Sequence, residues 1–349
     1  MKNTSHPSMT KKLAFIAIFA ATLIACKSTP QGGNTAGSEE ADDVATVQFD
    51  ADSTLRLIEA QCQFGPRTPG SNAHRRCGDY IVAQFRERGL EVTEQKAMLT
   101  AWDNKQFECR NIIASYLPEQ TNRIVLAAHW DSRPWADADP DASKHGQPVM
   151  AANDGASGVA VMLQIASLLK ELKPSCGIDF ICFDLEDYGA PEDAAGSDNH
   201  VQDWCLGSQH WAAHPHKPGY TARFGILLDM VGSKNARFYH EYSSMRYAQS
   251  VVARVWSAAH TAGYGEYFVQ EMGGAIEDDH IYMNAAGIPT IDIINTFPTN
   301  PSFGPTWHTT HDVPENISTE TLKAVGQTLV QFLYEMEKEE NPAPQTSSK

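Results

Sequence analysis

Basic residues are scarce in this sequence, and their scarcity excludes one large class of partners. Among 349 residues there are 27 Lys and Arg against 43 Asp and Glu, which gives a formal net charge of −16. Such an excess of negative charge repels the phosphates of nucleic acids and of anionic lipids. We therefore expect no nucleic-acid partner, and we expect any attachment to a membrane to depend on something other than a basic surface.

The first segment lacks an apolar run long enough to span a bilayer. Lys11 and Lys12 precede an apolar run from Leu13 to Ala25, which is too short to cross a membrane with margin. This arrangement is typical of a signal peptide over residues 1–25. The run ends in LIAC, which resembles the lipobox of bacterial lipoproteins, where the cysteine, here Cys26, is lipidated and becomes the first mature residue.

We therefore expect an exported bacterial lipoprotein that Cys26 anchors to a membrane of the cell envelope, facing the periplasm or the surface. An ordinary secretory signal, or a start at Met9, would also lead to export. Residues 26–48 are mostly small and polar, so we expect a flexible tether. Removal of residues 1–25 takes away three lysines and no acid, which leaves 24 basic against 43 acidic residues and a net charge of −19.

The cysteines show no CxxC spacing, so they do not predict a structural zinc site of the zinc-finger kind. An even number in an oxidising compartment permits disulfides, but the spacing alone assigns no pairing. Apart from Cys26, the cysteines are Cys62, Cys77, Cys109, Cys176, Cys182 and Cys205.

Internal repeats, low-complexity segments and a second linker are also absent from residue 51 up to the polar tail NPAPQTSSK. We therefore expect one catalytic domain over residues 49–340, followed by a disordered tail over residues 341–349. The length of this domain gives ample surface to bury as a core.

Apolar periodicity predicts helices and strands that alternate along much of this domain. The strands near residues 123–130 and 224–232 are apolar on both faces, as expected for a sheet that helices cover on both sides. The predicted class is α/β, with a mixed, centrally parallel sheet in a single domain. Helices are expected at 53–62, 72–88, 156–172, 243–263 and 319–338, and strands at 91–102, 107–117, 123–130, 178–187, 224–232 and 288–294.

Acidic side chains and histidines gather where these strands are expected to end. Ligands of such folds bind at the carboxyl ends of the strands, where carboxylates would repel one another unless a cation lay among them. A divalent metal is the simplest explanation. The candidates are His129, Asp131, Asp154, Glu186, Asp187, Asp229, Glu277, Asp278, Asp279, His280 and His308.

Taken singly, several of these residues also have a purely structural interpretation. Asp154 lies in an Asn-Asp-Gly turn and could begin the following helix, while Glu186 and Asp187 could be an exposed strand end. Residues 296–316 could be an ordinary surface loop. Asp229 lies within an apolar strand and needs a partner there. Their joint position at the strand ends favours a site.

Seven segments, in order, resemble the zinc-dependent (type II) glutaminyl-peptide cyclotransferases: HWDS, NDGASGVAVMLQIA, FDLEDYG, GSQHWA, LLDMVG, IEDDHIYMNAAGIPTIDII and WHTTHDVPENIS. These enzymes look like zinc aminopeptidases of the same α/β fold, and the resemblance covers most of residues 50–340. HWDS and NDGASG are shared with the aminopeptidases, whereas IEDDH, WHT and the carboxylate pair of DLED favour the cyclases.

The resemblance implies one zinc per chain, bound by Asp154, Asp187 and His308. Animal members have Glu-Glu where this chain has Glu186-Asp187, so the second ligand here is shorter by one methylene. Two carboxylates and an imidazole would also accept other divalent ions, so the choice of zinc depends on the resemblance.

The resemblance further implies that Glu186 is the catalytic acid and base, with Asp278 and Asp229 as its hydrogen-bonding companions. His129 matches a ligand of the second metal in dizinc aminopeptidases, and its role here stays open. For Trp307, plain packing is the alternative to a place in the pocket. The residues expected to line the substrate pocket are Trp307, Glu277 and Trp204.

The implied reaction converts the N-terminal Gln of peptides and exported proteins into pyroglutamate and releases ammonia, and we expect a monomer. A dizinc aminopeptidase is the main alternative, with His129 and Asp229 on a second ion, Asp154 bridging and Glu186 activating a water. A second alternative is a surface lipoprotein that keeps the fold as a binding module. The intact set of Glu186 and the three ligands argues against it.

Overall fold

The structure is a computed structural model that describes residues 44–191, 194, 203–296 and 303–342. The expected signal peptide, Cys26 and most of the expected tether lie outside these residues, as does the tail from residue 343. No helix in the described part of the chain is long and apolar enough to cross a membrane. Its six cysteines are all buried free thiols.

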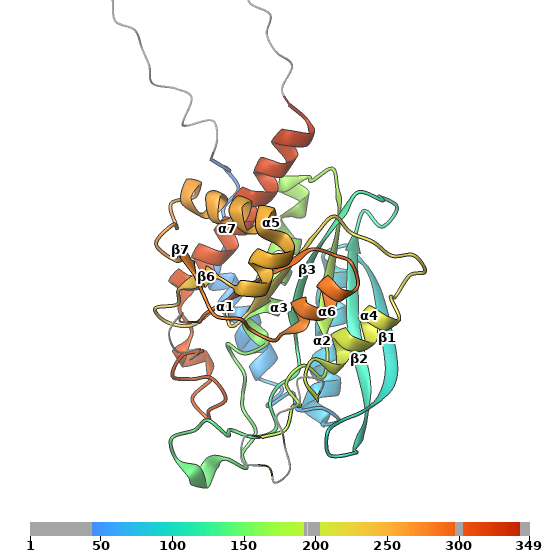
Figure 1. Cartoon of the computed structure of the whole chain (residues 1–349), viewed down its shortest axis with the longest axis vertical. Coiled ribbons are helices and arrows are strands. Elements are labelled where there is room, and N and C mark those ends of the chain that lie inside the picture. Colours follow the sequence, from blue (N-terminus) through green and yellow to red (C-terminus); the bar gives the residue numbers. More distant parts are fainter. Residues whose placement is uncertain (1–43, 192–193, 195–202, 297–302, 343–349) are drawn as a thin grey trace, which may run out of the picture. The chain divides into compact units, whose positions relative to one another are not determined.

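A six-stranded sheet in the order β1-β2-β4-β3-β5-β8 forms the centre of this part of the chain (Figure 1). β4, β3, β5 and β8 run parallel, whereas β1 and β2 are antiparallel at one edge. The expected mixed, centrally parallel sheet is thus confirmed. The strands are β1 (Glu91–Thr100), β2 (Gln106–Tyr116), β3 (Arg123–His129), β4 (Gly177–Phe183), β5 (Gly225–Asp229) and β8 (Thr290–Ile294).

Helices cover both faces of the sheet, but unequally. α1, α2, α3, α5 and α7 contribute to one large apolar core on the first face, and α4 and α6 pack on the second. Every residue of β3, β4 and β5 is buried, as their apolar sequences predict. The helices are α1 (Ala51–Cys62), α2 (Asn72–Glu87), α3 (Ala156–Leu172), α4 (Leu206–Ala213), α5 (Tyr242–Thr261), α6 (Asp279–Ala285) and α7 (Thr319–Glu340).

Four elements were not predicted from the sequence. A separate two-stranded sheet joins β6 (Phe238–His240) and β7 (Phe268–Met272), and α4 and α6 are helices of only eight and seven residues. Short elements carry too few periods of apolar residues to be recognised. Two single-turn helices, η1 (Ala142–Lys144) and η3 (Pro314–Asn316), complete the described elements.

Two predicted strands end earlier than expected, and the reason lies in the backbone. Leu185, after β4, and Met230, after β5, have φ angles of 57° and 48°. These left-handed conformations cannot continue a strand and turn the chain sharply. Gly155, at the start of α3, has φ of 97°, and a Cβ there would lie 2.9 Å from the carbonyl oxygen of Asp131. Only glycine permits this close approach.

A buried ion pair near the amino ends of β3 and β4 offers a test of how the sheet is stabilised. Asp179 accepts hydrogen bonds from Arg123 (Nε 2.7 Å, Nη2 2.6 Å) and from the hydroxyls of Ser115 (2.5 Å) and Tyr220 (2.7 Å). Replacing Asp179 by Ala leaves the Arg123 charge uncompensated. We expect Asp179→Ala to lower the free energy of unfolding by about 3 kcal/mol in urea titrations.

The matched control is Asp79→Ala, because Asp79 forms an ion pair with Arg110 (2.9 Å) but its side chain is 72% exposed. Exposed ion pairs contribute little to stability, so this variant should unfold like the wild-type protein. Equal unfolding curves for the two variants would contradict the stabilising role of Asp179.

Candidate active site

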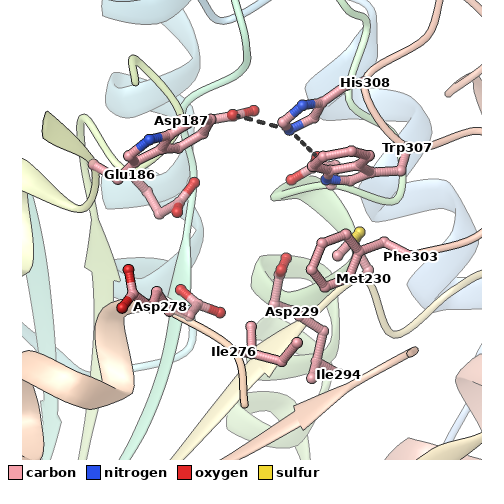
Figure 2. A pocket seen from close by; sticks show the side chains of 13 residues that line it. Glu186, Asp187, Asp229, Met230, Ile276, Asp278, Ile294, Phe303, Trp307 and His308 are labelled. Carbon is pink, nitrogen blue, oxygen red and sulfur yellow. Dashed lines mark ion pairs between the residues drawn. The ribbon is translucent and has the colours of Figure 1, made fainter. Parts of the chain in front are cut away.

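The carboxyl ends of the parallel strands meet at one pocket, as the sequence predicts. His129 and Asp229 are the last residues of β3 and β5, and Glu186 and Asp187 follow β4 in a tight turn. The side chains in Figure 2 converge on a cavity of about 70 Å³. Its lining residues are Asp154, Glu186, Asp187, Trp204, Asp229, Met230, Ile276, Glu277, Asp278, Ile294, Phe303, Trp307 and His308.

Asp154, Asp187 and His308, the three expected metal ligands, lie together. His308 Nε2 is 3.2 Å from Asp187 Oδ1 and 3.6 Å from Asp154 Oδ2, and one ligand atom from each residue lies within 4.8 Å of the others. All three residues are buried, and Oδ2 of each aspartate lacks a hydrogen-bond partner among the described residues. Two buried carboxylates and one imidazole that converge in this way fit a divalent cation.

Asp312 holds the first ligand in place from the loop that also carries His308. Its two carboxylate oxygens accept hydrogen bonds from the backbone N–H groups of Asn153 (2.8 Å) and Asp154 (3.0 Å). The loop therefore supplies one ligand directly and fixes the backbone of another. His308 has φ of 50°, a left-handed conformation that the contacts of the loop must maintain.

Arg133 holds the second ligand. Its guanidinium forms an ion pair with Asp187 (3.3 Å) and a bidentate pair with Asp137 (2.7 and 2.5 Å), and Asp137 in turn lies 3.5 Å from Nδ1 of His308. The same guanidinium lies 4.6 Å from the ring centre of Trp204. Arg133 thus connects both ligands with a pocket wall, and its charge offsets part of the negative charge of the site.

A second possible metal triad shares Asp154 with the first. His129 Nε2 lies 3.0 Å from Asp154 Oδ1 and 3.3 Å from Asp229 Oδ1, and the three residues are buried. These are the residues that the sequence assigns to the second ion in the aminopeptidase alternative. The geometry of the described residues therefore permits one or two ions at this edge of the sheet.

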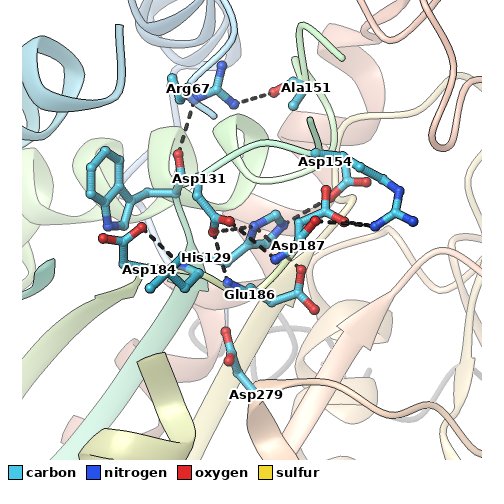
Figure 3. A network of polar contacts seen from close by, with 12 residues as sticks. Arg67, His129, Asp131, Ala151, Asp154, Asp184, Glu186, Asp187 and Asp279 are labelled. Atoms are coloured by element: carbon cyan, nitrogen blue, oxygen red, sulfur yellow. Dashed lines mark hydrogen bonds and ion pairs between the residues drawn. The ribbon is translucent and has the colours of Figure 1, made fainter. Parts of the chain in front are cut away.

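Asp131 positions the turn that carries Glu186 and Asp187. Its carboxylate oxygens accept hydrogen bonds from the backbone N–H groups of Glu186 (3.1 Å) and Asp187 (3.2 Å), as Figure 3 shows. Together with the left-handed Leu185, this contact directs Glu186 into the pocket and Asp187 toward His308. Asp131 is fully buried and does not itself line the pocket.

The carboxylate of Glu186 has unusual neighbours. The thiol of Cys205 lies 3.4 Å from Oε1, and ligand atoms of Glu186, Cys205 and Asp278 lie within 4.8 Å of one another. Burial raises the pKa of Glu186 well above its ordinary value; His129 opposes this shift, and the charges of Asp187 and Asp278 add to it. Such a carboxyl group can both take up and return a proton near neutral pH.

Aromatic and aliphatic side chains form the rest of the pocket. Trp307 packs against the His308 ring, with ring centres 3.7 Å apart, and against Phe303 at 4.9 Å. The ring of Trp204 lies parallel to that of His308 at 6.1 Å. The three residues expected in the pocket from the sequence, Trp307, Trp204 and the exposed Glu277, all line it.

Several residues of the site were not predicted from the sequence. Arg133, Asp312 and Cys205 act through contacts with other side chains or the backbone, and no spacing in the sequence reveals such contacts. Phe303 lies in a loop rich in proline and glycine, where its aromatic side chain is the only feature of the sequence that could indicate a place in the pocket. His311 is exposed and does not line the pocket.

Comparisons with known proteins agree with this geometry. The model of peptidase family M28 matches residues 111–333. The structure of the glutaminyl cyclase of Bacteroides thetaiotaomicron bound to N-acetylhistamine is 49% identical in sequence, covers 82% of this chain and 98% of that one, and has a TM-score of 0.80. A Zn-dependent exopeptidase from Parabacteroides distasonis is 50% identical, covers 83% of this chain and 99% of its own, and also has a TM-score of 0.80.

Aminopeptidase YwaD of Bacillus subtilis is 28% identical over 295 residues. The match covers 81% of this chain but only 57% of that longer protein. The relatives of this fold thus include a glutaminyl cyclase and a Zn-dependent exopeptidase. Because the family model matches well over half of the sequence, this chain belongs to peptidase family M28.

Proposed function

We propose that this protein is a zinc-dependent glutaminyl cyclase that converts the N-terminal Gln of peptides and proteins into pyroglutamate and releases ammonia. The observation that carries the proposal is the pairing of Glu186 with Asp278 beside the triad of Asp154, Asp187 and His308 in a small, aromatic-walled pocket. The similarity to the B. thetaiotaomicron glutaminyl cyclase over 82% of the chain supports it.

In this reaction the α-amine of the substrate attacks the carbon of its own side-chain amide. Glu186 lies at the pocket with its carboxylate directed inward (Figure 2), where it accepts the proton that the amine loses. The same carboxyl group then returns this proton to the departing nitrogen, so the new C–N bond forms, the old one breaks, and ammonia leaves. Asp278, which caps the start of α6, lies beside Glu186, and its negative charge, together with that of Asp187, adds to the effect of burial and favours the protonated form of Glu186.

We propose a single zinc ion per chain as the cofactor, and the convergence of Asp154, Asp187 and His308 supports this choice of site. When bound, zinc would polarise the amide carbonyl and offset the negative charge that develops on its oxygen. Asp154, Asp187 and His308 would hold it, and Arg133 would keep Asp187 in position despite its shorter side chain. The Trp307 ring and its neighbours would hold the side chain of the substrate folded back toward its own amine, so that the intramolecular attack needs little further ordering.

A dizinc aminopeptidase remains the second candidate function, because a specific observation favours it. The triad of His129, Asp154 and Asp229 has ligand atoms within 4.8 Å of one another. With an ion there, Glu186 would activate a water for peptide-bond hydrolysis. The small volume of the pocket and the position of Asp278 next to Glu186 favour the cyclase.

The two activities differ in the mass of the product. We expect a synthetic peptide that begins with Gln to lose one ammonia when it is incubated with the protein from residue 45 onward, and a matched peptide that begins with Leu to stay unchanged. Mass spectrometry of both peptides measures this. Loss of the whole first residue from either peptide would instead establish the aminopeptidase.

Glu186→Gln is the control for this assay, because it keeps the shape of the side chain and removes its ability to carry a proton. We expect kcat to fall by about 10²–10⁴-fold with a small change in KM. Zinc content should stay the same as in the wild-type protein. Full activity in Glu186→Gln would refute the catalytic assignment in both candidate functions.

Removal and stepwise return of the metal distinguish a site with one zinc ion per chain from a site with two. Dialysis against a chelator should abolish the activity, and titration with zinc should restore it fully at one equivalent per chain if the second triad plays no part. His308→Ala should weaken zinc binding by more than the roughly 10–100-fold expected for loss of an outer-shell contact. Competition with a chromophoric chelator measures this affinity.

His129→Ala is the matched variant for the second triad. In a single-zinc cyclase it leaves the zinc affinity within a few-fold of the wild-type value. Recovery only at two equivalents of zinc, together with loss of one ion in His129→Ala, would contradict the single-zinc proposal and favour the aminopeptidase.

We also propose that the protein is exported and anchored to a membrane of the cell envelope through a lipid on Cys26. The supporting observation is the LIAC sequence after a short apolar run that follows two lysines. Cys26→Ser should then move the protein from the membrane fraction of cells to the soluble fraction. An unchanged distribution between the two fractions would refute the anchor.

A further inference from the structure

Asp292 is a buried carboxyl group next to the site that neither the sequence nor the comparisons assign to any role. It lies on β8, opposite Leu227 of β5, and is 1% exposed. Because side chains alternate along a strand, Asp292 points to the same face as Ile294, which lines the pocket in Figure 2. Neither of its carboxyl oxygens has a hydrogen-bond partner among the described residues.

The surroundings of Asp292 contain more negative than positive charge. Nδ1 of His280, on α6, lies 3.9 Å from Oδ2 of Asp292, which is too far for a hydrogen bond. Its other nitrogen, Nε2, is already 3.2 Å from Glu241 at the start of α5. The charged groups with the largest effect on Asp292 are four acids, namely Asp278, Asp229, Glu241 and Asp279.

An ionised carboxylate in this place would be costly, because burial removes its hydration and no hydrogen-bond donor among the described residues replaces the lost water. Burial, followed by the charges of Asp278 and Asp229, raises the pKa of Asp292 well above its ordinary value. Oδ2 of Asp278 is also buried without a hydrogen-bond partner among the described residues. Ligand atoms of Asp278, His280 and Asp292 lie within 4.8 Å of one another, so small rotations of the two carboxyl groups would let one proton serve both.

We propose that Asp292 is a neutral carboxylic acid that shares its proton with Asp278 and thereby positions Asp278 beside Glu186. Asp292 does not touch the pocket and is a positioning residue, not a catalytic one. Its backbone is itself fixed, since its N–H donates to Ser244 Oγ (2.9 Å), which in turn donates to Glu241 (2.7 Å). The catalytic role of Asp278 rests on the proposed cyclase function, whereas the neutrality of Asp292 does not.

Thermal unfolding as a function of pH tests the neutral state. Above pH 4 the unfolded chain releases the proton of Asp292, whose ordinary pKa is about 3.9, whereas the folded protein keeps it. Rising pH therefore favours unfolding of the wild-type protein, and Asp292→Asn removes this effect. We expect Asp292→Asn to melt at least about 2 °C above the wild-type protein at pH 7.5, and the difference to vanish near pH 4.

Asp179→Asn is the matched control, because Asp179 is an equally buried aspartate of the same sheet that Arg123 holds in its ionised form. Interaction with Arg123 and the hydroxyls of Ser115 and Tyr220 lowers the pKa of Asp179 despite its burial. Its contribution to stability is present above the unfolded pKa, so Asp179→Asn should melt below the wild-type protein at pH 7.5. If Asp292→Asn behaves like this control, or if its difference from the wild-type protein is the same at both pH values, the proposal is overturned.

Kinetics test the positioning role. Asp292→Leu has similar bulk but no donor for Asp278, so kcat should fall about tenfold while KM changes less than about twofold. Asp292→Asn offers an N–H in place of the O–H and should restore most of kcat. Equal kcat values for the Leu and wild-type proteins would overturn the positioning role, and a kcat for Asn as low as that for Leu would do the same.

The two sets of measurements fail independently. If the wild-type protein does not cyclise N-terminal Gln at all, the proposed function is wrong, and the melting series still decides whether Asp292 is neutral. If Asp292→Leu does not fold, Asp292→Ala, which also lacks a donor, takes its place in the kinetic comparison, and the melting of Asp292→Asn still tests the neutral state.

Discussion

The constraint on which the rest of this structure depends is the excess of buried negative charge at the carboxyl ends of the parallel strands. Asp154, Asp187, Asp229 and Asp278 are all nearly inaccessible to water, and Arg133 is the one fully buried arginine among the described residues that pairs with any of them. An uncompensated buried carboxylate costs several kcal/mol. The fold can therefore tolerate this edge only if cations or protons occupy it, and both are what the proposed chemistry requires.

The backbone, more than the side chains, brings these acids together. Left-handed turns at Leu185 and Met230 end β4 and β5, the strands on either side of β3, at the site, and His308 has the same conformation in the facing loop. Each such residue costs of order 1 kcal/mol or more, so other contacts must maintain it. Asp131 does so next to Leu185 by accepting the backbone N–H groups of Glu186 and Asp187. Asp312 fixes the backbone of Asn153 and Asp154 in the same way, so two acids position the backbone that carries others.

The sequence predicts the sheet better than it predicts the way the site is supported. Runs of apolar residues such as those in β3 and β5 are easy to recognise as buried strands in the sequence. The polar residue that ends each run, His129 or Asp229, is then expected at the carboxyl end of the strand. The short helices α4 and α6 did not have enough apolar periods to be predicted, although Asp278 is the N-cap residue of α6 and its carboxylate accepts a hydrogen bond from the N–H of Asp279. Support from Arg133 depends on contacts between residues far apart in the chain, which a single sequence does not reveal.

The shared position of Asp154 explains how one scaffold can serve two reactions. If a second cation occupied the triad with His129 and Asp229, it would offset the charge there and the neighbouring acids could ionise, which suits a site that activates water. Without that cation, protons can offset part of the same negative charge, because burial and mutual repulsion favour the protonated form of Asp278 and also that of Glu186 once it has taken the proton of the amine. That proton is what the departing ammonia needs. In the proposed cyclase, protons would therefore take the place that a second ion has in the aminopeptidase alternative.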